Sequence, residues 1–194
     1  NVAAREGGIG NLGELTVMNT TLSGNIALNG DGGGFENFEA ATATLIDTTI
    51  SLNTAGRNGG GIANRAGGSL TLVDTAVQGN TADAEGGGIY NAGAVTATSS
   101  TVAGNAASSS AGGGVANLGT FALVDSTISA NTAIWGGGLH NGFPGTFSIT
   151  NSTVSDNTAM RFGGGIYNHN DASAEVVGTI ISNNIAMVSA GGIS

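Results

Sequence analysis

Apolar side chains alternate with small or polar side chains over short stretches of the chain. Leu70 and Leu72 flank Thr71, and a few residues further on Val77 lies between small or polar neighbours. A period of two is typical of short, half-buried strands rather than of helices. A third stretch begins at a glycine triplet and buries Ile89. The pattern therefore predicts three short strands in succession, each burying one side of its backbone.

The same succession recurs along the whole chain, and its glycines mark each copy. A clear copy reads Gly-Gly-Gly-Ile-Tyr-Asn at residues 86–91. Recurrence at intervals of 24 to 27 residues predicts an all-β fold, a parallel β-helix of about seven coils with three short strands per coil. The third glycine of each copy is Gly8, Gly34, Gly61, Gly88, Gly114, Gly138, Gly165 or Gly192.

Coils of a parallel β-helix stack about 4.8 Å apart, so equivalent residues lie above one another in columns. Aliphatic columns would fill the interior, a column of alanines would mark a tight corner, and stacked asparagines would bond amide to amide. We therefore predict two asparagine ladders. The first comprises Asn11, Asn37, Asn64, Asn91, Asn117, Asn141 and Asn168, and the second comprises Asn25, Asn53, Asn80, Asn105, Asn131, Asn157 and Asn184. The alanine column comprises Ala27, Ala55, Ala82, Ala107, Ala133, Ala159 and Ala186.

The composition excludes two other classes of glycine-rich protein. Of the 194 residues, 36 are glycine, only one is proline, and 40% are hydrophobic. Collagen needs glycine at every third position with abundant proline, and disordered chains are poor in hydrophobic residues. The lack of cysteine excludes disulfides and thiolate metal sites. A repeat architecture is what remains.

The charge balance disfavours two classes of partner. Thirteen carboxylates face four arginines and no lysine, which gives a net charge of -9. An acidic surface repels phosphate backbones and anionic lipid, so we expect no nucleic-acid partner. No apolar run approaches the ~18 residues of a transmembrane segment. An acidic chain rich in small polar residues fits an exported bacterial protein, and we expect an extracellular or cell-surface location.

The two ends of the chain suggest a piece of something longer. The chain starts without methionine and stops inside an eighth copy of the repeat. We therefore expect residues 1–194 to form a single β-helix domain, a segment of a longer chain with both ends uncapped. Uncapped coils would expose unpaired strand edges, from which we expect end-to-end self-association.

The glycine phrase, together with the later sequence Ser-Thr-Ile-Ser-x-Asn-Thr-Ala, resembles the repeats of right-handed parallel β-helix proteins of the bacterial surface and secreted type. That group includes polymorphic outer-membrane proteins and autotransporter passengers. The resemblance extends over all 194 residues and implies a single-stranded, right-handed solenoid. Members are mostly adhesins and structural exoproteins, with some polysaccharide-degrading relatives, so the resemblance specifies a fold rather than an activity.

Departures from the repeat gather late in the chain. Trp135 precedes one glycine triplet, and Arg161 with Phe162 precedes the next. His140 and Tyr167 hold the outward positions of the strands that follow. All five would lie on one edge of coils six and seven, beside glycines that we expect to leave the backbone approachable. Aromatic rings beside a shallow trough suit a sugar ring, so we hypothesise glycan binding. The alternative is that the rings only cover the corner of the rod.

An enzymatic function rests on weaker signals. Asp47 and Asp74 hold equivalent positions on neighbouring coils, close enough to share a cation. Polysaccharide cleavage on a β-helix needs clustered carboxylates with a basic residue or calcium, and no arginine or lysine shares their column. Turns also commonly carry aspartate for local backbone bonds. A β-helix polysaccharide lyase or glycoside hydrolase therefore stays an alternative. We name no catalytic residue and expect no cofactor. The candidates for a metal site are Asp47 and Asp74, and the signal for them is weak.

A different surface suggests ice binding as a further alternative. The strand before the second asparagine of each coil has two outward positions, which form two rows of hydroxyls like the Thr-x-Thr faces of ice-binding β-helices. Gln78 and Ile180 interrupt this face, and threonine is common on any exposed strand. The candidate ice-binding residues are Thr21, Ser23, Thr49, Ser51, Thr101, Thr127, Ser129, Thr153 and Ser155.

Among these alternatives, the sequence favours a non-enzymatic, extracellular β-helix of a bacterial surface or secreted protein. Its role would be structural or adhesive. Its partner would be a glycan or another surface ligand.

Overall fold

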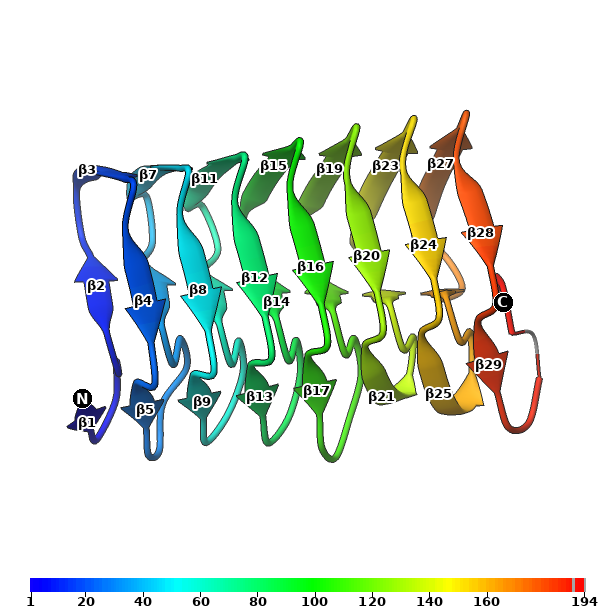
Figure 1. The fold of residues 1–194 in the computed structure, drawn as a ribbon, viewed down its shortest axis with the longest axis horizontal. Coiled ribbons are helices and arrows are strands. Elements are labelled where there is room, and N and C mark those ends of the chain that lie inside the picture. The colour runs from blue at the N-terminus through cyan, green and yellow to red at the C-terminus, as the bar shows by residue number, and fades with distance from the viewer. Residues whose placement is uncertain (190, 194) are drawn as a thin grey trace.

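A computed structural model describes residues 1–189 and 191–193. Within them all regular secondary structure is β-strand, and the chain coils into a parallel solenoid whose N- and C-terminal ends lie at opposite ends of the rod (Figure 1). Every coil contributes one strand to each of four parallel sheets, which we name A to D. The predicted fold class is thereby confirmed.

The strands of each sheet recur at one position of the coil. Sheet A contains β1 (Val2–Ala3), β5 (Ile26–Ala27), β9 (Thr54–Ala55), β13 (Thr81–Ala82), β17 (Ala106–Ala107), β21 (Thr132–Trp135), β25 (Thr158–Phe162) and β29 (Ile185–Ala186). Sheet B contains β2 (Ile9–Asn11), β6 (Phe35–Asn37), β10 (Ile62–Asn64), β14 (Ile89–Asn91), β18 (Val115–Asn117), β22 (Leu139–Asn141) and β26 (Ile166–Asn168). Sheet C contains β3 (Glu14–Met18), β7 (Thr42–Ile46), β11 (Ser69–Val73), β15 (Ala94–Thr98), β19 (Thr120–Val124), β23 (Thr146–Thr150) and β27 (Ser173–Val177). Sheet D contains β4 (Thr21–Ser23), β8 (Thr49–Ser51), β12 (Ala76–Gln78), β16 (Thr101–Ala103), β20 (Thr127–Ser129), β24 (Thr153–Ser155) and β28 (Ile180–Ser182).

The structure has four strands per coil where the sequence predicts three. Sheets B, C and D correspond to the predicted strands, and sheet A is the addition. Most sheet A strands are two residues long, and they end on the alanine column, as at Ala82. So short a strand shows no alternation of apolar and polar residues, which is why its period could not be read.

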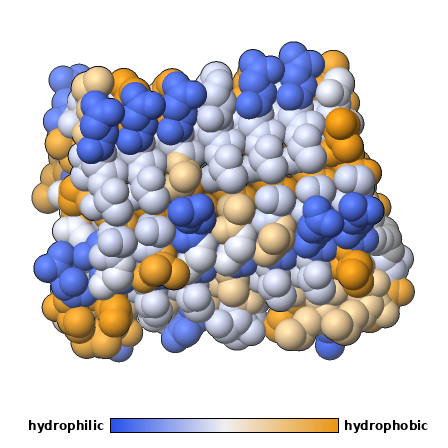
Figure 2. Space-filling model, in the orientation of Figure 1, coloured by the Kyte–Doolittle hydropathy of each residue, from blue (hydrophilic) through white to orange (hydrophobic). Residues whose placement is uncertain are grey.

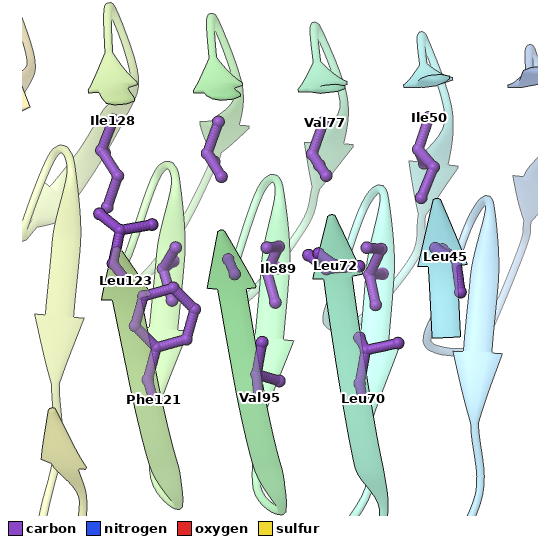
Figure 3. Close-up of a cluster of buried hydrophobic side chains, with 14 of the residues drawn as sticks. Leu45, Ile50, Leu70, Leu72, Val77, Ile89, Val95, Phe121, Leu123 and Ile128 are labelled. Carbon is purple, nitrogen blue, oxygen red and sulfur yellow. The ribbon is translucent and has the colours of Figure 1, made fainter. Parts of the chain in front are cut away.

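Inward-facing aliphatic side chains form the core. Leu70 and Leu72 of sheet C, Val77 of sheet D and Ile89 of sheet B are at most 1% exposed and point toward a common interior (Figure 3). Pairing places like on like, since Ile62 lies opposite Ile89 and Leu72 opposite Leu45. Burial of each such side chain contributes about 1.5–3 kcal/mol, so the stacked columns supply the main driving force for the fold.

The three glycines of a triplet serve three different needs. Gly86 has a φ of +67°, a left-handed conformation that favours glycine. A Cβ on Gly87 would lie 2.4 Å from the carbonyl oxygen of Ala106, and a Cβ on Gly88 would lie 2.7 Å from that of Gly114. The triplet is therefore a tight bend that ends before the sheet B strand begins at Ile89, rather than the start of that strand.

The expectation that the late glycines leave the backbone approachable is wrong. Gly138 and Gly165 are buried, because each is covered by the next coil and by a ladder asparagine. A Cβ on Gly138 would lie 2.5 Å from the carbonyl oxygen of Gly165 and 2.9 Å from the side-chain amide of Asn157.

Both predicted asparagine ladders are present. Along the first, each side-chain amide donates to the side-chain oxygen of the next coil at 2.7–2.9 Å. Along the second, the corresponding distances are 2.9–3.0 Å. In the second ladder the side-chain oxygen also accepts a backbone N–H, as Asn105 does from Asn80. The ladders thus satisfy polar groups that the corners would otherwise bury unpaired.

Candidate functional site

Sheet B presents one outward position per coil, at the middle of each three-residue strand. In β14, Ile89 and Asn91 are buried inward, whereas Tyr90 between them is partly exposed. Parallel pairing keeps these middle residues in one column, which we call the sheet B face. In coil order the column is Gly10, Glu36, Ala63, Tyr90, Ala116, His140 and Tyr167.

The structure brings together the five residues that the sequence groups as a glycan site. The rings of His140 and Tyr167 stack with their centroids 5.5 Å apart, and Phe162 stacks on Tyr167 at 6.2 Å. The guanidinium carbon of Arg161 lies 5.8 Å from the centroid of Trp135. Trp135 and Phe162 are paired neighbours in sheet A. The cluster therefore combines flat apolar faces with one cation.

Trp135 reaches this edge because the chain turns early in coil six. Only Ile134 and Trp135 separate Ala133 from the next glycine triplet. Strand β21 runs through them, whereas β5, β9, β13 and β17 are two residues long. A register shift between Ala133 and Trp135 fits β21 to the longer β25. The shortened connection thus places the single tryptophan at the end of β21, paired with Phe162 of the next coil.

These rings border a hollow of about 370 Å³, which we call the aromatic hollow. Of the five predicted residues, Trp135, His140 and Tyr167 line it directly. Sequence reasoning missed the other lining residues, because they belong to loops whose length varies from coil to coil. They are Glu85, Ser110, Ala111 and His169.

Burial shifts the pKa values of two groups that line the aromatic hollow. Burial, with a smaller contribution from His169, lowers the pKa of His140 from 6.5 to about 4. Within the described part of the chain, the buried Nδ1 of His140 has no hydrogen-bond partner. Burial also raises the pKa of Glu85, whose Oε1 lies 3.5 Å from the hydroxyl of Ser110. The hollow therefore offers a neutral imidazole and ring faces.

A second hollow, of about 240 Å³, lies over the beginning of the same face, and it is not among the sites predicted from the sequence. We call it the arginine hollow, because three of the four arginines of the chain line it. Its lining residues are Arg5, Glu6, Asn29, Gly30, Asp31, Glu36, Phe38, Arg57 and Arg65.

Two buried carboxylates hold Arg65 in the arginine hollow. Its Nε and Nη2 both lie 2.6 Å from Oε1 of Glu36, and its Nη1 lies 2.9 Å from Oδ2 of Asp31. The other oxygen of Asp31 accepts the backbone N–H of Asn58 at 2.8 Å. Arg57 approaches Asp31 only to 4.0 Å, and its side chain is 62% exposed.

Burial raises the pKa of Glu36, although its bonds to Arg65 oppose the shift. Buried ion pairs gain little net stability, so this cluster points to a role other than holding the fold. The repeat pattern contains a signal for this ion pair. Glu36 holds an outward sheet B position, and Arg65 follows the ladder asparagine of the next coil.

The candidate ice-binding residues lie where the sequence places them. Thr21 pairs with Thr49 and Ser23 with Ser51 in sheet D. Further along, Thr101, Thr127 and Thr153 continue one row, and Ser129 pairs with Ser155 in the other. Figure 2 views the molecule from the sheet D side and shows small, weakly polar residues below a row of hydrophilic corner residues. Gln78 and Ile180 interrupt the array as expected.

The hydrophilic corner explains Asp47 and Asp74. Both have a φ of +47°, a left-handed conformation that asparagine and aspartate adopt more readily than other side chains. The equivalent residues Asn19, Asp125 and Asn151 have φ values between 48° and 50°. Local backbone geometry is therefore a sufficient reason for aspartate in this column.

Metal and membrane features can be assessed for the described residues. Among residues 1–189 and 191–193, no three His, Cys, Asp or Glu side chains are grouped so that they could hold a metal ion. In the same ranges there is no helix long and apolar enough to cross a bilayer.

Two segments of the chain match a known family profile. Residues 74–92 and 151–169 match the family profile of the Chlamydia polymorphic membrane protein repeat. Each matched segment runs from a sheet D corner through a glycine triplet to the end of a sheet B strand, and contains Tyr90 or Tyr167. The resemblance predicted from the repeats is thereby confirmed. No curated protein and no solved structure matches the chain.

Proposed function

We propose that this chain is a non-enzymatic, extracellular β-helix of a bacterial surface protein, and that the aromatic hollow binds glycan. The surface location is supported by the two segments that resemble polymorphic membrane protein repeats. The solenoid acts as a rigid support for the hollow.

The observation that carries the proposal is the arrangement of rings around the aromatic hollow. Trp135, His140 and Tyr167 line it from two neighbouring coils, and stacking holds the last two parallel within 13°. Parallel ring faces beside a shallow hollow suit the apolar face of a pyranose, while Glu85 and Ser110 offer hydrogen bonds to its hydroxyls.

The carboxylates favour binding over cleavage. Among the described residues that line the aromatic hollow, Glu85 is the single carboxylate. Hydrolysis of a glycosidic bond generally uses two carboxylates that flank the bond. A lone acid with polar neighbours is better suited to accept hydrogen bonds from a bound sugar.

Intrinsic fluorescence tests the proposal directly, because Trp135 is the only tryptophan. We expect oligosaccharides to change its emission saturably. Tyr167→Ala retains the reporter and should weaken binding about tenfold, the loss of one stacked ring. Phe143→Ala is the matched control, since Phe143 is 63% exposed and does not line the hollow. No emission change with any neutral or acidic oligosaccharide, confirmed by calorimetry, would overturn the proposal.

A further inference from the structure

The arginine, histidine, tyrosine and tryptophan side chains of this chain gather over sheet B and the neighbouring end of sheet A. The sequence has four arginines, two histidines, one tryptophan and two tyrosines. Three arginines line the arginine hollow, and the fourth lies over Trp135 at the aromatic hollow. Both histidines and Tyr167 line the aromatic hollow, and Tyr90 lies between the two hollows in the same column. Side chains placed without regard to function would scatter over all four sheets.

The charges are distributed just as unevenly. The arginine hollow holds three arginines and three carboxylates, Glu6, Asp31 and Glu36, so its formal charge is zero. Subtracting them from the 4 arginines and 13 carboxylates leaves 1 and 10, a charge of -9 outside the hollow. The whole net charge of the chain therefore lies elsewhere. The arginine hollow therefore repels an anion less than the rest of the surface does.

The buried carboxylates leave two arginines available. Glu36 accepts a hydrogen bond from Arg65, and Asp31 forms an ion pair with it, so the guanidinium is held in place. Arg57, whose single ionic contact is at 4.0 Å, and Arg5 are both exposed at the rim. A guanidinium carries five donors in a planar fork that matches a carboxylate. The rim can thus bind an oxyanion while the buried ion pairs hold the floor rigid.

We propose that the sheet B face binds a linear anionic glycan along the solenoid axis, with an acidic group at Arg5 and Arg57 and further sugar rings on Tyr90 and in the aromatic hollow. This inference rests on the proposed function and adds the ligand class and the second subsite. From Glu36 to Tyr167 the column rises through five coils, a span of about 24 Å at the strand spacing. The ligand must therefore be an oligomer rather than a single sugar.

The test compares oligogalacturonates with their methyl-esterified counterparts of equal length, by Trp135 fluorescence and calorimetry at several salt concentrations. We expect the acid form to bind at least tenfold more tightly, with an affinity that falls as salt rises. Arg5→Gln with Arg57→Gln should abolish this preference by weakening binding of the acid form about tenfold, to an affinity no higher than that of the ester. Both positions are exposed, so an unchanged melting temperature should show that the double variant folds.

The outcomes separate the two proposals. If acid and ester bind equally, or if the double variant keeps the preference, the anionic subsite is wrong while glycan binding stands. If neither binds, the proposed function fails as well. Sulfated oligosaccharides that bind more tightly than uronates would identify sulfate as the source of the anion and support the subsite. An oligonucleotide that binds as tightly as the uronate would overturn sugar recognition.

Discussion

The imidazole of His140 lies parallel to the phenol of Tyr167, one coil away along sheet B, with 5.5 Å between the ring centroids. The Nδ1 of His140 is buried and has no hydrogen-bond partner among the described residues. Burial disfavours the charged imidazolium, and His169 adds a smaller effect, so the pKa of His140 falls to about 4 and the neutral ring is favoured above that pH.

The first prediction concerns acid stability. The pKa of His140 is 6.5 unfolded and about 4 folded, so the unfolded state takes up the proton first as pH falls. Stability from this group is complete above pH 6.5 and is lost as pH falls toward 4. Relative to His140→Phe, which stacks but does not titrate, the wild type should lose about 2–3 kcal/mol over this range after allowance for partial exposure. Urea unfolding at several pH values measures the difference.

The matched control for that comparison is His169→Asn. His169 is exposed and only a secondary cause of the shift, so the variant should keep most of the wild-type pH dependence. Parallel stability profiles for wild type and His140→Phe would contradict the assignment of the low pKa to burial of this ring.

The second prediction separates the roles of individual glycines. A Cβ on Gly87 would collide with backbone atoms at 2.4 Å, so Gly87→Ala should cost more than about 3 kcal/mol of unfolding free energy. Gly104 has a φ of +63° but no neighbour nearer than 3.9 Å, so Gly104→Ala should cost about 1–2 kcal/mol from backbone strain alone. Gly13 has nothing within 4 Å, and Gly13→Ala should change stability by about 0.5 kcal/mol or less. Equal effects at Gly87 and Gly13 would show that the coils are not stacked as closely as described.

The columns could be predicted from the sequence because a solenoid converts sequence spacing into spatial neighbourhood. Asn91 and Asn117 are ladder neighbours because they lie 26 residues apart at equivalent positions. His140 and Tyr167 could be grouped by the same rule. Which residues a side chain contacts depends also on its length and direction, and the spacing of the repeats does not give either.

The arginine hollow was missed for that reason. Arg65 extends from its own corner across to Glu36 and Asp31 in the preceding coil, so its partners are neither equivalent to it nor close in sequence. The loop residues Glu85 and Ser110 were missed because loop length varies and no repeat position marks them. Repeats thus predict the scaffold and the outward column, whereas contacts between columns depend on the three-dimensional structure.

The third prediction is that the sheet D array does not bind ice. Each sheet D strand has three residues, and left-handed corners such as Ser99 (φ +50°) and Gly104 (φ +63°) flank it. The outward side chains therefore form two short rows, and Gln78 and Ile180 break the continuous hydroxyl array that a flat ice-binding face would need. Nanolitre osmometry of millimolar protein should show no thermal hysteresis beyond that of albumin.

A repaired variant sharpens the test of ice binding. Ala76→Thr with Gln78→Ser completes both rows on β12 without changing a buried residue. Hysteresis in the wild type would contradict the prediction. Hysteresis in the repaired variant alone would show that the gap at β12 is what abolishes it.

The fourth prediction concerns the buried ion pairs of the arginine hollow. Arg65→Met leaves Asp31 and Glu36 buried without their cation, which should cost about 3–5 kcal/mol of unfolding free energy. Burial already raises the pKa of Glu36 in the presence of Arg65. Without Arg65 this pKa should rise further, so Glu36 takes up a proton, and the loss should be larger at pH 8 than at pH 5. Arg57→Met should cost less than about 1 kcal/mol, since that side chain is 62% exposed.

Neutralising both acids distinguishes charge from packing as the cause. If the cost of Arg65→Met comes from uncompensated carboxylates, adding Asp31→Asn and Glu36→Gln should restore most of the lost stability, because neutral amides tolerate burial better than charges do. If the triple variant stays as unstable as Arg65→Met, the arginine acts through its packed side-chain stem instead. Restored stability together with a lost preference for acidic glycans would show that the cluster is kept for binding rather than for folding. That outcome would explain why a chain with only four arginines commits one of them to buried carboxylates.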